Sequence, residues 1–240
     1  MSDAHAVRTG TSGFSYKEWK GVFYPQDIAA GDMLAFYAGQ LSACEINNTF
    51  YRMPKASVLE GWAAQTPDTF RFVLKASRRI THFKRLKVEK EVGDDLAYFL
   101  SQAAALGPRL GAILFQLPPN FKKDLARLQA FLALLPDDAR AAFEFRHPSW
   151  LGDDVFDVLR EHGAALCIAE SDEDVTPFVA TAPWGYLRLR KQGYDAGELE
   201  AWAERVAEQD WQETFVFFKH EDAGAGPKLA REFASRLADL

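Results

Sequence analysis

Residues 141–170 read AAFEFRHPSWLGDDVFDVLREHGAALCIAE, and this stretch decides the fold. A β-rich run at 141–146 is followed by a helix-like stretch at 153–161, which ends at a His-Gly pair, and by a second β-rich run at 165–170. A glycine just past the last periodic residue is a common signal for the end of a helix. Strands joined through a helix pair in parallel, because a parallel pair needs a long crossover connection. The stretch therefore predicts one strand–helix–strand unit.

The same alternation continues along the rest of the chain. Eight β-rich runs lie at 7–13, 43–50, 71–77, 110–117, 141–146, 165–170, 186–190 and 214–220. Helix-like stretches lie at 33–41, 57–65, 94–106, 122–135, 153–161, 195–208 and 227–240. The segment 176–183 contains two prolines and no helical period, so we expect irregular structure there.

Eight strand–helix units in 240 residues favour a closed (β/α)8 barrel, the TIM-barrel fold of the α/β class. The alternative, an open doubly wound sheet, usually carries a glycine-rich dinucleotide motif after a strand. Gly10-Thr11-Ser12-Gly13 does not match that motif, and no other stretch does. Because the chain shows no linker, low-complexity tract or shift in composition, residues 1–240 are expected to form a single domain.

Composition excludes several classes of protein. Hydrophobic residues make up 48% of the chain and charged residues 26%, the balance of a soluble globular protein rather than a disordered one. The sequence has no apolar run of about 18 residues that would span a membrane, and residues 1–10 lack the apolar core of a signal peptide. Cys44 and Cys167 lie in apolar runs and are predicted to be buried free thiols, which indicates a reducing, cytoplasmic compartment.

Polar side chains replace apolar ones, with a period of two, at the C-terminal ends of the predicted strands. They are Glu45, Asn47, Lys75, Ser77, Gln116, Glu144, Arg146, Glu170, Arg188, Arg190 and Lys219. Alternate residues of a barrel strand face the lumen, and the active sites of barrel enzymes lie at the C-terminal mouth. The pattern therefore predicts a polar site at that mouth.

The residue types suggest roles within this site. The carboxylates Glu45, Glu144 and Glu170 are predicted to transfer protons, so we expect an enzyme, either a hydrolase or a lyase. A desolvated Lys75 is a candidate to form a Schiff base. The predicted substrate-binding residues are Asn47, Gln116, Arg146, His147, Arg188 and Lys219.

A purely structural role is the alternative for each of these residues. Glu144 and Arg146 lie two residues apart on one strand face, so they are the clearest candidates for an internal ion pair. We expect the functional role instead, in which case neutralising Glu144 costs little stability.

Charge is distributed unevenly along the chain. Seven basic residues and one acid fall within residues 75–90, whereas the chain as a whole has a net charge of −6. This basic segment follows the third predicted strand and is expected to overhang the mouth. We therefore predict attraction of a small anionic metabolite that carries a phosphate or a carboxylate. Binding of RNA or another polyanion along the basic segment is the alternative, and the negative net charge favours the small anion.

Signals for a metal and for pocket walls are weaker. His82, His147 and His220 each follow the end of a predicted strand, and a divalent metal on these histidines is the one cofactor alternative. Their spacing matches no metal-binding motif, so no metal site is predicted. Four aromatic residues in loops after strands are expected to wall a pocket: Trp19, Phe50, Tyr51 and Trp150.

Several segments occur together in a familiar order. They are GTSGFSY at 10–16, GVFYP at 21–25, EINNTFYR at 45–52, FVLKA at 72–76, ITH at 80–82, QLPP at 116–119 and EFRHPSW at 144–150. In this order they resemble the YecE-like proteins, family 72 of the domains of unknown function, over nearly the whole chain. The resemblance implies a barrel of the TIM type, and it implies no established reaction or catalytic residue.

Two strand ends depart from the commonest pattern of that family. The seventh strand there often ends in Arg-Leu-His-Gly, whereas this chain has Arg188-Leu189-Arg190-Lys191. The eighth often ends in paired asparagines before an aspartate, whereas this chain has Lys219-His220-Glu221-Asp222. The comparison predicts a subgroup with a more basic mouth.

Overall fold

Eight parallel strands close into a barrel in the computed structural model, which describes residues 5–88, 90–219 and 224–240. The strands are β1 (Ala6–Ser12), β2 (Ala43–Ile46), β3 (Arg71–Lys75), β4 (Leu110–Gln116), β5 (Ala141–Glu144), β6 (Ala165–Glu170), β7 (Trp184–Leu189) and β8 (Glu213–Phe218). Each strand pairs in parallel with the next, and β1 also pairs in parallel with β8. The closing β1–β8 pair excludes the open sheet and confirms the predicted (β/α)8 barrel.

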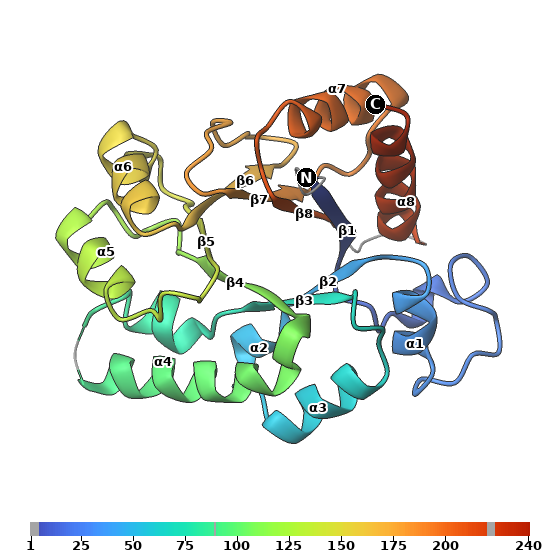
Figure 1. The fold of residues 1–240 in the computed structure, drawn as a ribbon, viewed down its shortest axis with the longest axis horizontal. Helices are drawn as coiled ribbons and strands as arrows, with labels where there is room; N and C mark the ends of the chain where they lie inside the picture. Colours follow the sequence, from blue (N-terminus) through green and yellow to red (C-terminus); the bar gives the residue numbers. More distant parts are fainter. Residues whose placement is uncertain (1–4, 89, 220–223) are drawn as a thin grey trace.

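Helices surround the strands, as Figure 1 shows. They are α1 (Met33–Ala38), α2 (Asn48–Tyr51), α3 (Ala56–Ala64), α4 (Lys90–Ala103), α5 (Leu125–Leu132), α6 (Asp153–Glu161), α7 (Ala196–Ala207) and α8 (Ala225–Ala238). Short 3-10 turns η1 (Lys17–Trp19), η3 (Ala104–Arg109) and η4 (Pro148–Trp150) and the π-helical turn η2 (Arg79–Phe83) lie in the connections. Local sequence fixes some of these starts: Asp195 and Glu198 form a reciprocal capping box at the start of α7.

The strands bury both of their faces, so the molecule has two apolar cores. The larger core lies between the barrel and its helices, and the smaller one fills the lumen. Large rings from β7 and β8 occupy the lumen opposite alanines of the other strands. At one contact, a Cβ on Gly111 would lie 2.8 Å from the Phe215 ring, so only glycine fits there. Cys44 and Cys167 are buried free thiols, as predicted.

Two segments show how the chain departs from a regular repeat. The strand predicted at 43–50 stops at Ile46, and Asn48–Tyr51 forms α2 instead. Among the described residues no helix lies between β6 and β7, which confirms the irregular structure expected there. In that segment, Thr181 Oγ1 accepts from the Leu166 amide at 2.7 Å and donates to the Ala164 carbonyl at 2.8 Å. These side-chain bonds hold the segment against the barrel without a helix.

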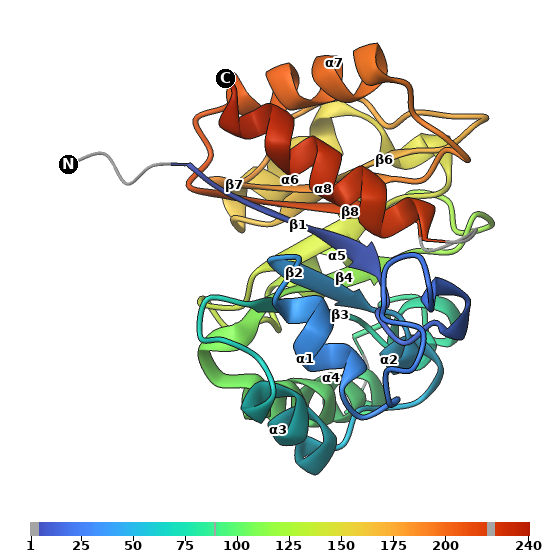
Figure 2. The same cartoon turned by 90° about the vertical axis from the view of Figure 1, so that its right-hand side faces the viewer.

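The two ends of the barrel differ in their chemistry. In Figure 2 the arrowheads of β1 and β2 point to the same end, where α2 also lies, and this end is the C-terminal mouth. At the opposite end, Glu213 binds Arg8 Nε at 2.8 Å and also pairs with Arg140. Among the described helices, none is both long enough and apolar enough to cross a membrane.

Candidate functional site

Arg188 organises the charged groups inside the mouth. This β7 residue is only 4% exposed. Its NH1 donates to Glu144 Oε2 at 2.5 Å, and its NH2 donates to Glu45 Oε1 at 2.8 Å. Its Nε is buried and has no hydrogen-bond partner in the described part of the chain. One guanidinium from β7 therefore joins carboxylates from β2 and β5 across the lumen.

Glu45 is a fully buried carboxylate that accepts from four donors. Besides Arg188, Ser12 Oγ donates at 2.8 Å, Asn47 Nδ2 at 3.1 Å and Tyr186 OH at 2.6 Å. Burial raises the pKa of Glu45, but Arg188, Tyr186 and Ser12 outweigh burial, so the pKa lies below its ordinary value. Glu45 is therefore ionised at neutral pH.

Glu144 is also fully buried and ionised. Its Oε1 lies 2.5 Å from NH2 of Arg146, in addition to its bond with Arg188. Burial raises the pKa of Glu144, but Arg188, Arg146 and Arg190 outweigh burial and lower it to about 2. A carboxyl with this pKa cannot donate a proton at neutral pH, so Glu144 is restricted to the role of a base or an electrostatic anchor.

Lys75 is a half-buried amine at the end of β3 whose pKa lies close to neutral pH. Its Nζ lies 4.3 Å from the centroid of the Phe50 ring, and it forms no ion pair with any described residue. Burial and then Arg188 lower the pKa of Lys75 to about 8, against the opposite effects of Glu45 and Glu144. The desolvation on which a Schiff-base role of this lysine depends is therefore present in the structure.

A cleft of about 450 Å³ adjoins the charged cluster. Its lining includes the cations Arg146 and Arg190, the carboxylates Glu144, Glu170, Glu173 and Asp174, and the side chains of Gln116 and His147. The Arg146 side chain is 33% exposed and pairs with Glu144. The Arg190 guanidinium forms no hydrogen bond or ion pair within the described residues. Burial and then Arg188 lower the pKa of Arg190.

Inside the mouth, four cations surround two buried carboxylates. Among the described residues, Lys75, Arg146, Arg188 and Arg190 interact electrostatically with one another and with Glu45 and Glu144. Because both carboxylates are already bound to arginines, they leave Lys75 and Arg190 uncompensated.

Glu170 does not face the lumen as predicted, although it lies at the mouth and lines the charged cleft. Leu166 and Ile168 of the same strand pack into the outer core, and Glu170 shares their face. Its Oε2 accepts from Trp202 Nε1 of α7 at 2.9 Å. The strand is buried on both faces, so its sequence alternation did not reveal which face lines the lumen.

The other predicted substrate-binding residues lie at the same end of the barrel. Asn47 touches Glu45, and Gln116 and His147 line the cleft. His147 also has a local structural role, because its Nδ1 accepts from the Ser149 amide at 3.1 Å at the start of η4. Lys219 directly follows β8 at the mouth.

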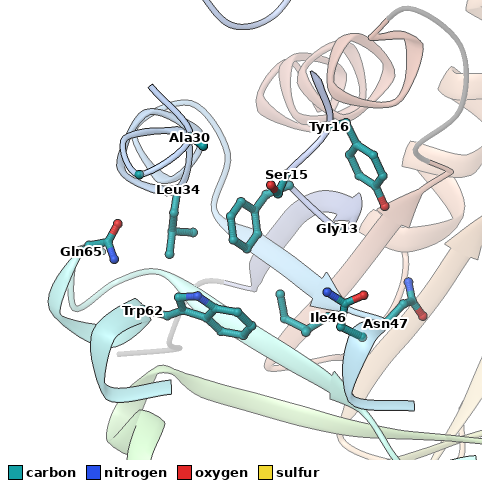
Figure 3. A pocket seen from close by; sticks show the side chains of 12 residues that line it. Gly13, Ser15, Tyr16, Ala30, Leu34, Ile46, Asn47, Trp62 and Gln65 are labelled. Atoms are coloured by element: carbon teal, nitrogen blue, oxygen red, sulfur yellow. The ribbon is translucent and has the colours of Figure 1, made fainter. Parts of the chain in front are cut away.

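A second cleft, of about 430 Å³, lies beside the mouth between the loop after β1, α1 and α3. Figure 3 shows Ser15, Leu34, Ile46, Asn47 and Trp62 around this space. No charged side chain lines it. The two clefts therefore differ in their lining, since charged side chains line the cleft that contains Arg146 and Arg190.

The predicted aromatic walls divide into two groups. Trp19 and Trp150 are buried in the core at 1% and 0% exposure, so they do not wall a pocket. Phe50 lies against Lys75, and Tyr51 is exposed at the rim. The two tryptophans are core residues because their large apolar rings fill the space behind the strand-end loops.

Part of the positive charge of the basic segment at 75–90 is paired with an acid, and the backbone of this segment is strained. Asp95 of α4 pairs with Arg79 NH2 at 3.2 Å and with Lys84 Nζ at 3.1 Å. After the π-helical turn η2, Arg85 and Leu86 have positive φ angles of 49° and 60°. Two consecutive left-handed residues without glycine are unusual, and such strain is concentrated at functional sites.

The described histidines that were candidates for a metal site, His82 and His147, each bond a different neighbour. His82 Nδ1 hydrogen-bonds Thr81 Oγ1 at 3.0 Å, and His147 bonds Ser149. Within residues 5–88, 90–219 and 224–240, no group of three or more His, Cys, Asp or Glu side chains is placed to hold a metal ion. His220 lies outside the described residues.

Two contributors to the cluster were absent from the predicted set of site residues. Tyr186 is in phase with Arg188 and Arg190 along β7, so the same period of two would have found it. Ser12 ends β1, and only its pairing opposite Glu45 shows why it matters.

Comparison with known proteins agrees with this architecture. The sequence model of the family described as "Protein of unknown function DUF72" matches residues 8–240. The UPF0759 protein YecE of Escherichia coli (strain K12) is 36% identical over 115 residues, which cover 48% of this chain and 41% of that protein. The UPF0759 protein YunF of Bacillus subtilis (strain 168) is 30% identical over 132 residues, 53% of this chain and 47% of that protein. The chain thus spans about half the length of the curated relatives it matches.

Solved structures give the same result over the full barrel. A DUF72 family protein from Thermotoga maritima superposes with a TM-score of 0.83 at 27% identity, covering 98% of this chain and 100% of the other. One from Enterococcus faecalis has a TM-score of 0.78 at 21% identity, with 99% of each chain covered, and shows the shared fold. On the strength of the match over residues 8–240, the chain belongs to the DUF72 family of proteins of unknown function.

Proposed function

We propose that the barrel mouth is the active site of an enzyme that binds a small metabolite carrying a phosphate or a carboxylate. One observation carries the proposal: Lys75 and Arg190 lie beside the buried Glu45–Arg188–Glu144 cluster, and neither forms an ion pair with any described residue. Burying a cation without a charged partner costs free energy, and a bound anion would supply that partner.

The geometry suggests how the anion binds. Arg146 and Arg190 line the charged cleft, so an anion there gains two guanidinium partners. Arg188 is held by Glu45 and Glu144 and serves to fix the two carboxylates. An oxyanion beside Arg146 would compete with Glu144 for its guanidinium and would leave the Arg188 bonds intact.

The protonation states favour base chemistry. Glu45 and Glu144 are both ionised at neutral pH, so neither supplies a proton to a leaving group. Lys75, with a pKa of about 8, can accept or give a proton near neutrality. Of the two expected reaction classes, lyase chemistry that begins with proton abstraction or amine attack therefore fits better than acid-catalysed hydrolysis.

Thermal unfolding with a panel of anions tests the proposal. Phosphate, sulfate and pyruvate at low ionic strength are expected to raise the melting temperature; at about 100 times Kd the gain is roughly 2.7 kcal/mol, or roughly 5–10 °C for a chain of this size. Arg190→Gln is expected to abolish the shift. Arg160→Gln is the matched control, since that arginine is 46% exposed on α6 and pairs with Asp157. No shift with any anion in the parent protein would refute the proposal.

Binding of a nucleic-acid strand is the second candidate, and one observation favours it. Tyr51 and Phe83 are each 67% exposed at the rim. The Arg78 guanidinium lies 5.6 Å from the centroid of Tyr51 and 5.3 Å from that of Phe83. Exposed rings beside arginine resemble the platforms on which single-stranded bases stack. The pairing of Asp95 with Arg79 and Lys84 weakens this candidate, because it removes free positive charge from the same segment.

A further inference from the structure

Lys75 occupies a fixed position at the end of β3. It shares the lumen-facing side of the strand with Val73. Thr49 Oγ1 donates to the Lys75 carbonyl at 2.7 Å and lies 3.0 Å from the Ile46 carbonyl, which ties α2 to the ends of β2 and β3. This tie holds Phe50 against the amine, whose Nζ lies 4.3 Å from the ring centroid. The amine therefore has a pre-organised, partly apolar seat.

Among the described residues, neither of the two carboxylates that act on this amine is free to hold it as an ammonium ion. The Glu45 oxygens accept from Ser12, Asn47, Tyr186 and Arg188. The Glu144 oxygens are bound by Arg146 and Arg188. Burial and then the neighbouring arginines lower the pKa of Lys75 to about 8. At pH 7.5 roughly a quarter of such an amine is uncharged, against about one part in a thousand for an ordinary lysine.

We propose that Lys75 is a covalent catalytic lysine that forms a Schiff base with a small anionic carbonyl compound, whose carboxylate or phosphate is held by Arg146 and Arg190. This inference rests on the proposed anion site and assigns its substrate class. An amine that is only a counter-charge would gain most from an adjacent free carboxylate. Here the seat offers an aromatic face, and both carboxylates are bound to other groups.

The covalent step balances without an oxidant or a reductant. The uncharged Lys75 nitrogen attacks the carbonyl carbon, and the carbon–oxygen π electrons move to the oxygen. The carbinolamine that forms then takes up one proton and releases its oxygen as water, which leaves a protonated imine. The overall step consumes one amine, one carbonyl and one proton, and yields one iminium ion and one water.

Neighbouring groups can relay the proton that this step needs and can stabilise the cation that it forms. His82 packs edge-on against the same Phe50 ring, with 4.8 Å between centroids. Burial and then Lys75 lower the pKa of His82, so its imidazole is neutral and can relay a proton. The ionised Glu45 and Glu144 lie near enough to Lys75 to act on its charge, and they would stabilise the iminium cation.

Reductive trapping with sodium cyanoborohydride tests the inference. The parent protein is incubated with glycolaldehyde phosphate or with pyruvate, and the modified residue is located by peptide mass spectrometry. Acetaldehyde is the uncharged comparison. We expect one adduct on Lys75, formed at least tenfold faster than on the exposed Lys228, slowed by inorganic phosphate and faster as the pH rises from 7 to 9. The two anionic probes distinguish a phosphate-bearing substrate from a carboxylate-bearing one.

Two variants complete the experiment. Lys75→Arg keeps a cation and is expected to lose the adduct while it keeps the thermal shift with phosphate. Lys228→Arg is expected to behave like the parent. Adducts spread over surface lysines, or equal trapping of Lys75 by acetaldehyde, would overturn the inference. If phosphate still stabilises the parent in that case, the anion site stands and only the covalent role fails; if no anion stabilises it, the proposed function fails as well.

Discussion

At the scale of single residues, the structure most changes what we expect from neutralising Glu144, namely its effect on the stability of the fold. A neutral variant was expected to cost little stability, yet Glu144 is fully buried between Arg188 and Arg146. Its pKa of about 2, against 4.5 ordinarily, corresponds to about 3 kcal/mol of stability at neutral pH. We now predict that Glu144→Gln loses about 3 kcal/mol in denaturant unfolding at pH 7.

The pH dependence of this loss has a definite sign. Because the folded state lowers the pKa of Glu144, its contribution is complete above pH 4.5 and disappears as the pH falls towards 2. The gap between parent and Glu144→Gln should therefore narrow over that window. A gap below 1 kcal/mol at pH 7, with an unchanged m-value, would contradict the prediction.

Lys75, in contrast to Glu144, is expected to lower the stability of the fold at neutral pH. Its pKa is lowered from 10.5 to about 8, so the folded protein disfavours the ammonium form. The parent should gain stability as the pH rises from 8 to 10.5, because the folded state loses its proton before the unfolded state does. Lys75→Met should be more stable than the parent by about 1–2 kcal/mol at pH 7, after allowance for partial solvent screening. The advantage should vanish near pH 10, and a less stable variant at pH 7 would show that Lys75 supports the scaffold.

Most of the charged residues in the cluster could be predicted from the sequence. Glu45, Lys75, Glu144 and Arg188 lie where a period of two placed them. Glu170 did not follow, because both faces of β6 are apolar earlier in the strand and either face fits the lumen. The pairing of Asp95 with the basic segment was also invisible, since it depends on how α4 packs against η2.

At the scale of elements, the exposed rings on α2 and on η2, the turn between β3 and α4, decide between the two candidate functions. If Tyr51 and Phe83 were a stacking platform, Tyr51→Ala or Phe83→Ala would weaken binding of a short single-stranded RNA about 5- to 100-fold. We predict a change below twofold, measured by fluorescence anisotropy at low salt. Tyr98→Ala is the matched control, because Tyr98 is a 47% exposed aromatic on α4.

The salt dependence of the same titration gives a second criterion. A polyanion held by several cations releases counterions, so its affinity falls steeply as salt rises. A steep slope together with losses above tenfold in Tyr51→Ala and Phe83→Ala, but not in Tyr98→Ala, would establish nucleic-acid binding and displace the small anion as the first candidate.

The elements themselves were largely predictable, and their ends were not. The strand predicted at 43–50 stops at Ile46, and α2 follows it, held by Thr49 Oγ1, which donates to the Lys75 carbonyl and lies 3.0 Å from the Ile46 carbonyl. That one contact carries Phe50 and Tyr51 from a strand onto a helix at the mouth. β-rich composition alone does not encode such a long-range bond.

At the scale of the whole molecule, the two ends of the barrel separate stability from binding. Glu213 pairs with Arg8 and Arg140 at the end opposite the mouth. Glu213→Gln is predicted to lower the free energy of unfolding by about 1–3 kcal/mol, since it weakens hydrogen bonds to charged groups. The thermal shift caused by phosphate should stay as in the parent. A loss of that shift in Glu213→Gln would mean that the anion binds at the end of the barrel opposite the mouth.

The central claim is that an anion binds between Arg146 and Arg190 at the C-terminal mouth. A crystal structure of the protein soaked with phosphate at low ionic strength tests it most directly. We predict density for one phosphate in the charged cleft, within hydrogen-bonding distance of both guanidinium groups, with the bonds from Arg188 to Glu45 and Glu144 unchanged. Phosphate found only elsewhere, such as in the uncharged cleft beside Ser15 and Trp62 or among the arginines around Glu213, would contradict the claim.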